Sequence, residues 1–87
     1  MGINVLVVDD SAVMRAMITK TLHLTGLPID AVLQAGNGAE AWETIRHSKV
    51  DLALVDINMP VMSGEELIDK VRKDWRTSML PIMVISP

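Results

Sequence analysis

The sequence contains no cysteine, and this absence excludes several kinds of chemistry. Without a thiol the chain forms no disulfide, has no cysteine nucleophile and cannot bind zinc through sulfur. Aromatic residues are nearly absent too, at 2%, with two Trp and no Phe or Tyr. The core must therefore consist of aliphatic side chains and of methionine, which adapts to irregular gaps.

Two further absences restrict the environment of the chain. No apolar run approaches the roughly 20 residues that span a bilayer. The first apolar run is also too short for a signal peptide, because it leads directly into Asp9 and Asp10. The net charge of −3 provides no basic face for nucleic acid. We therefore expect one cytoplasmic domain over residues 1–87, with no nucleic-acid or membrane partner.

Four short apolar segments are typical of β-strands. They are residues 5–8, 29–35, 52–55 and 82–85. The second is the weakest, because Asp30 and Gln34 interrupt it. The other three are continuously apolar, which indicates strands covered on both faces, as in a parallel sheet.

Amphipathic segments between these strands predict three helices. Their residues are 12–24, 39–47 and 65–75. Ser11 is placed to cap the first helix and Gly26 to end it. The resulting order, βαβαβαβ, predicts an α/β fold with a parallel sheet flanked by helices. Trp42 and Trp75 occur at helical spacing among apolar residues, so we expect both to pack against the core.

Carboxylates follow two of the predicted strands. Asp9 and Asp10 come after the first strand, and Asp56 comes after the third. Parallel strands would bring all three to the carboxyl edge of the sheet. Two unit charges about 4 Å apart repel by about 1 kcal/mol in water and about 4 at an effective dielectric near 20. Oxygen ligands then favour Mg²⁺ as the neutralising cation.

Simpler explanations exist for each acid when it is taken alone. Asp9 and Asp10 are a plausible helix-capping pair, and Asp56 is a plausible solvated loop acid. Together they favour a carboxylate nucleophile for phosphorus, with Ser86 placed to donate a hydrogen bond to the phosphoryl group. An aspartate-nucleophile phosphatase is the weakest alternative, since no second Asp follows two residues after Asp9, Asp10 or Asp56.

Motifs over nearly the whole chain resemble the receiver domain of two-component response regulators. The segments are VLVVDDS (residues 5–11), GNGAEA (36–41), DINMPVMSG (56–64) and PIMVIS (81–86), in the family's order. The residues after Asp10 are most similar to chemotaxis-type, single-domain receivers. The resemblance implies a flavodoxin-like doubly wound parallel sheet.

The resemblance also assigns roles to individual residues. Asp56 would accept a phosphoryl group from a histidine kinase or a phosphotransfer protein. Mg²⁺ would be bound by Asp10 directly, by Asp9 largely through water, by Asp56 and by the backbone carbonyl of Asn58. Ser86 matches the hydroxyl that moves toward the phosphoryl group. The loop after Asp56 would be shaped by Met59, Pro60 and Gly64.

The sequence ends at Pro87, before three elements of a complete receiver. Those elements are the fourth helix, the fifth strand and the fifth helix, together with a site Lys and an aromatic switch residue. We therefore expect a truncated receiver domain that is not an enzyme. We also expect a homo-oligomer, because self-association would cover the sheet face and edge that truncation exposes. An alternative function is a self-associating assembly module with little signalling activity.

Overall fold

The strands and helices follow one another in the predicted order. A computed structural model describes residues 2–59 and 61–85. The elements are β1 (Ile3–Val8), α1 (Ala12–Leu24), β2 (Ile29–Ala35), α2 (Gly38–His47), β3 (Leu52–Asp56), α3 (Gly64–Lys73) and β4 (Ile82–Ile85). The predicted cap of α1 is confirmed, because the Ser11 side chain accepts a hydrogen bond from the Met14 N–H.

The four strands form one parallel sheet in the order β2-β1-β3-β4. The strands richest in aliphatic residues, β1 and β3, occupy its centre, where neighbouring strands satisfy their backbone on both sides. Val8 of β1 pairs with Val55 of β3, so the two strands end side by side. This topology confirms the predicted flavodoxin-like arrangement of βαβαβαβ elements.

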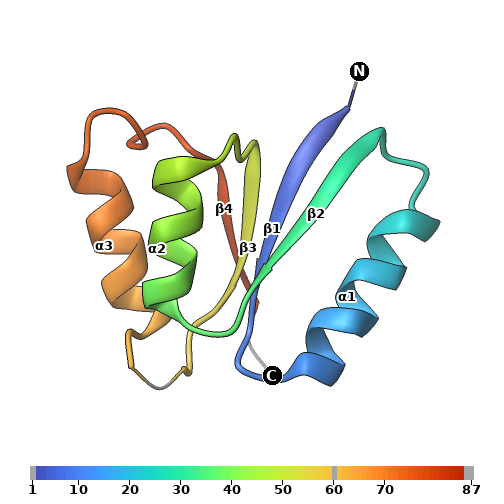
Figure 1. The fold of residues 1–87 in the computed structure, drawn as a ribbon, viewed down its shortest axis with the longest axis horizontal. Coiled ribbons are helices and arrows are strands. Elements are labelled where there is room, and N and C mark those ends of the chain that lie inside the picture. Colours follow the sequence, from blue (N-terminus) through green and yellow to red (C-terminus); the bar gives the residue numbers. More distant parts are fainter. Residues whose placement is uncertain (1, 60, 86–87) are drawn as a thin grey trace.

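Helices cover the two faces of the sheet unequally (Figure 1). On one face, α2 and α3 contribute Ala41, Leu67 and Val71 to a buried cluster with Leu6 and Val55. On the other face, α1 has no buried residue and covers only part of the sheet. Several apolar side chains of α1 and β4 remain exposed: Val13, Met14, Met17, Leu24, Met83 and Val84.

Helix α3 ends two residues earlier than predicted. Asp74 adopts an extended conformation at the C-cap and starts a turn, in which its carboxylate accepts the Arg76 N–H. Trp75 therefore lies outside the helix and is 85% exposed, so the prediction that it packs against the core is wrong. For Trp42 the prediction is confirmed, because its half-buried ring packs against the core cluster.

Candidate functional site

Three carboxylates meet at the carboxyl edge of the sheet. Asp9 and Asp10 directly follow β1, and Asp56 is the last residue of the neighbouring strand β3. One carboxylate oxygen from each residue lies within 4.8 Å of the others. The parallel register of β1 and β3 thus produces the convergence that the sequence predicts.

Backbone N–H groups orient two of these carboxylates. Asp9 Oδ1 accepts a hydrogen bond from the Ser11 N–H at 2.9 Å, and Asp56 Oδ1 accepts one from the Asn58 N–H at 3.1 Å. Each acid therefore keeps Oδ2 for another ligand. Asp9 and Asp56 are only 5% and 9% exposed, whereas Asp10 is exposed to solvent. The cluster therefore has two buried acids at the strand ends and is accessible to solvent at Asp10.

Arg15 of α1 forms hydrogen bonds with the end of β1, next to the cluster, and with β2. Its Nη1 donates to the backbone carbonyl of Asp9 at 2.6 Å, and its Nε donates to Gln34 Oε1 of β2 at 3.0 Å. The guanidinium thus ties α1 to β1 and β2 without pairing with a carboxylate of the cluster. Sequence reasoning missed this residue, since its position on the polar side of the helix suggested only a solvated cation.

Close backbone contacts shape the loop that follows Asp56. A Cβ on Gly64 would lie 2.6 Å from the Asp56 carbonyl oxygen, and a Cβ on Gly38 would lie 2.5 Å from that of Met62. The N–H groups of both glycines donate to this loop, to Ile57 and to Met62 respectively. Only glycine fits such approaches without moving the backbone.

Backbone strain accompanies these contacts at Val61. Its φ of 70° lies in the left-handed region, which a β-branched residue rarely adopts. Such strain costs on the order of 1–3 kcal/mol and persists only where neighbouring structure imposes it. The loop beside Asp56 is therefore held in a conformation that its own sequence disfavours.

The cluster has the donor set of a hard-cation site. None of the ion pairs formed within residues 2–59 and 61–85 involves Asp9, Asp10 or Asp56. Three close carboxylates without a cationic side chain repel one another and gain from a bound divalent ion. Oxygen-only ligands, with solvent access at Asp10, suit a cation that keeps some of its water.

Comparison with known proteins identifies the family. The family model described as "Response regulator receiver domain" matches residues 5–87. The chain belongs to the response regulator receiver domain family. Its receiver sequence is 42% identical over 84 residues to chemotaxis protein CheY1 of Helicobacter pylori, covering 95% of this chain and 66% of that protein. The chain thus spans slightly less than two thirds of that relative's length, and the chemotaxis-type resemblance is confirmed.

Solved structures agree with this assignment. The receiver domain superposes on CheY4 of Vibrio cholerae with a TM-score of 0.85 and 34% identity, over 97% of this chain and 68% of that one. It superposes on the phosphorylated cyanobacterial phytochrome response regulator RcpA with a TM-score of 0.88 and 25% identity, over 99% and 66% of the two chains.

Two of the remaining predicted site residues, Asn58 and Met59, lie in the described part of the loop after Asp56. Asn58 is exposed and follows Asp56 by two residues, and Met59 is half-buried against the core cluster. Pro60 and Ser86 lie outside the described residues. The roles assigned to these four residues remain predictions.

Proposed function

We propose that this receiver domain accepts a phosphoryl group on Asp56, with Mg²⁺ bound beside it, as the phosphoacceptor module of a two-component phosphorelay. The observation that carries the proposal is the convergence of Asp9, Asp10 and Asp56 within 4.8 Å in a chain of this family. A carboxylate nucleophile beside two further acids that can hold a divalent cation suits a metal-assisted phosphoryl transfer.

In the transfer, Asp56 Oδ2 attacks phosphorus. The phosphorus–oxygen bond of an aspartyl phosphate forms as the phosphorus–nitrogen bond to the donor histidine breaks, and the bonding pair returns to the imidazole. The Asn58 N–H holds Oδ1 at 3.1 Å and so directs Oδ2 outward. Bound Mg²⁺ would offset the negative charge on the transferred group.

The cation would be held by oxygen atoms from two loops. Asp10 would bind the cation directly and Asp9 largely through water. Asp56 and the Asn58 carbonyl would be the remaining protein ligands. Arg15 supports this set, because it fixes the Asp9 carbonyl and hence the start of the Asp9–Asp10 turn. Ser86 would supply the hydroxyl that approaches the phosphoryl group.

Membership of the family supports a proposal for the phosphoryl donor and for the signalling pathway. A histidine kinase or a phosphotransfer protein would supply the phosphoryl group, and the phosphorylated state of RcpA supports acceptance by a domain of this fold. Chemotaxis signalling is the setting of the relatives named CheY. We further expect a cytoplasmic protein that is not itself an enzyme. In the described part of the chain, no helix is long and apolar enough to cross a membrane.

Mass spectrometry after incubation with Mg²⁺ and acetyl phosphate tests the proposal. We expect the added mass of one phosphoryl group on the wild-type protein and none on Asp56→Ala. Asp30→Ala is the matched control, because Asp30 is an exposed acid on β2. It should be phosphorylated like the wild type, and chelating Mg²⁺ should abolish uptake in both. Uptake that persists in Asp56→Ala, or no uptake by the wild type, would contradict the proposal.

Self-association remains a separate prediction. It is supported by the exposure of Met14, Met17 and Met83, at 40%, 58% and 59%. We expect sedimentation to detect a dimer at micromolar concentration, and Met17→Glu to dissociate it by placing a charge in the apolar face. A stable monomer would show that this face needs no second copy.

A further inference from the structure

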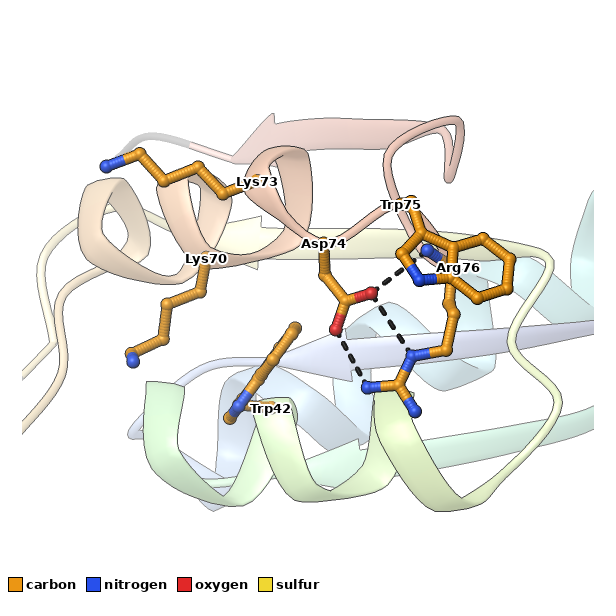
Figure 2. Close-up of a pocket in the computed structure, with 6 residues that line it drawn as sticks. All are labelled: Trp42, Lys70, Lys73, Asp74, Trp75 and Arg76. Carbon is orange, nitrogen blue, oxygen red and sulfur yellow. Dashed lines mark hydrogen bonds and ion pairs between the residues drawn. The ribbon is translucent and has the colours of Figure 1, made fainter.

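Both tryptophans of the chain line one surface groove far from the carboxylate cluster. Its residues come from the middle of α2, from the end of α3 and from the turn after α3. Both helices end at the amino edge of the sheet, opposite the edge that carries Asp56 (Figure 1). The groove is shallow and widely open to solvent, has a volume of about 630 Å³ and is lined by Trp42, Lys70, Lys73, Asp74, Trp75 and Arg76 (Figure 2). We refer to it as the tryptophan groove.

The tryptophan groove carries more cations than acids, although one of the cations, Lys73, already pairs with Asp69 of α3 at 2.9 Å. Three of its lining residues are cations and only Asp74 is an acid. Arg76 neutralises that acid, because its Nη2 and Nε approach the carboxylate at 2.9 and 3.2 Å. These hydrogen bonds lower the pKa of Asp74 to about 2. Lys70 takes part in none of the ion pairs found among residues 2–59 and 61–85, so its charge is available to a ligand.

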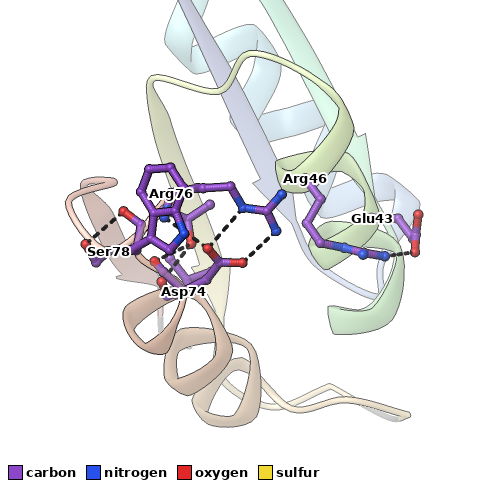
Figure 3. A network of polar contacts seen from close by, with 8 residues as sticks. Glu43, Arg46, Asp74, Arg76 and Ser78 are labelled. Carbon is purple, nitrogen blue, oxygen red and sulfur yellow. Dashed lines mark hydrogen bonds and ion pairs between the residues drawn. The ribbon is translucent and has the colours of Figure 1, made fainter.

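The two indole rings differ in how they are held. Trp42 is half-buried, and the Arg46 guanidinium lies 5.5 Å from its ring centre while pairing with Glu43 (Figure 3). Trp75 is 85% exposed. An exposed indole loses apolar stabilisation in the free protein and recovers it when a partner covers the ring.

The turn that carries Trp75 is anchored to α3. Thr77 Oγ1 donates to the Val71 carbonyl at 2.7 Å, and Arg72 Nη1 donates to the Leu80 carbonyl at 2.7 Å. The backbone that presents the indole is therefore fixed before any ligand binds, which reduces the entropic cost of association.

A second hollow extends the groove past Trp75. It encloses about 530 Å³ and shares Trp75 and Arg76 with the first, while adding Lys49 and Met79. Met79 is 89% exposed. The second hollow also contains one acid, Asp51, whose carboxylate accepts a hydrogen bond from the Asn4 N–H. The two hollows meet at Trp75 and Arg76, so lysines and apolar side chains lie on both sides of the exposed indole.

We propose that the tryptophan groove binds an acidic peptide segment of a partner protein that also carries apolar side chains. Carboxylates of the segment would pair with Lys70 and Lys49, and its apolar side chains would cover Trp75 and Met79. Aromatic residues that are exposed when free and covered when bound often dominate the energy of an interface. Polyphosphate ligands suit this surface less well, because they carry no apolar groups to cover the exposed side chains of Trp75 and Met79.

Tryptophan indole N–H signals in a two-dimensional NMR spectrum test this proposal on the whole protein. The probe is a short peptide of alternating Glu and Leu, and the chain's two tryptophans provide two signals. We expect both signals to move on titration. Lys70→Glu and Trp75→Ala should each weaken binding by about tenfold. Lys20→Glu is the matched charge-reversal control on exposed α1 and should leave the affinity unchanged.

Control ligands and variants define the results that would contradict peptide binding. Stronger binding of anionic phospholipid vesicles or of single-stranded DNA than of the acidic peptide would overturn the proposal, as would equal losses in Lys70→Glu and Lys20→Glu. A peptide of alternating Lys and Leu should not bind. Asp56→Ala should retain full peptide affinity, so failure at the groove and failure of phosphorylation are distinguishable.

Discussion

The two edges of the sheet use charge in opposite ways. At the carboxyl edge, Asp9 and Asp56 are buried at strand ends and have no cationic partner among the described side chains. At the amino edge, Lys73 and Arg76 lie on exposed helix and turn positions, and each pairs with a nearby acid. At the carboxyl edge the three carboxylates repel one another, and a bound cation would reduce this repulsion. At the amino edge most cations are already paired with acids of the protein.

This difference indicates how tightly each region is coupled to folding. Strand ends belong to the backbone framework, so changes beside Asp56 alter the stability of the whole domain. Exposed ion pairs contribute little, with a median near 0–1 kcal/mol. Binding at the amino edge can therefore change during evolution with small effects on the fold. Substitutions at the carboxyl edge should therefore cost more stability than substitutions at the amino edge.

Gly64→Ala should destabilise the domain most. The new Cβ would lie 2.6 Å from the Asp56 carbonyl oxygen, so the backbone must shift. We expect a loss of about 3 kcal/mol in the free energy of unfolding, measured by urea denaturation. Gly36→Ala is the control, because its Cβ would meet only side chains, the nearest at 3.6 Å. Equal losses for the two variants would contradict the contact at Gly64.

Mg²⁺ should stabilise the carboxyl edge by a similar amount. At a free concentration about a hundred times its Kd, the ion adds about 2.7 kcal/mol to the free energy of unfolding. Asp10→Asn should remove most of this gain, while Asp30→Asn, the exposed acid on β2, should retain it. Thermal unfolding at constant ionic strength, with Mg²⁺ or with chelator, measures the difference. Identical melting temperatures would exclude a metal site formed by these acids.

The two tryptophans should differ in their contribution to folding. Trp42→Ala removes a half-buried ring that packs against the core cluster, so we expect a loss of about 2 kcal/mol. Trp75→Ala removes a ring that is 85% exposed and should change stability by less than about 0.5 kcal/mol. Chemical denaturation of both variants provides the comparison. A large loss in Trp75→Ala would mean that this ring is a structural element and not a free binding surface.

The smallest effect on stability concerns the pH dependence of the Asp74–Arg76 pair. Arg76 lowers the pKa of Asp74 from 3.8 to about 2 through side-chain and backbone hydrogen bonds. Because the folded pKa is depressed, this contribution is fully present above about 3.8 and is lost as the pH falls through about 2. An NMR titration of the carboxyl carbon should have its midpoint near the lower value. In Arg76→Ala the midpoint should return toward 3.8.

The sequence was most informative where strong local signals agreed. Apolar runs predicted the strands of the central sheet, and Ser11 predicted the start of α1. The convergence of Asp9, Asp10 and Asp56 followed, because parallel strands align their carboxyl ends. Boundaries were less predictable: the helical spacing of Trp75 suggested packing, but Asp74 prefers to bond the backbone of the turn and ends α3.

The element order, the family and the three acids at one edge were therefore predictable from the sequence, because they depend on apolar periodicity and on residues next to strand ends. Contacts between segments distant in the chain were not predictable in this way, and the folded structure was needed to identify them. It showed that Arg15 braces the Asp9 carbonyl and that Gly64 touches the end of β3. It also brought Trp42 and Trp75 to one groove. Such proximities depend on how the helices pack on the sheet, which no local pattern encodes.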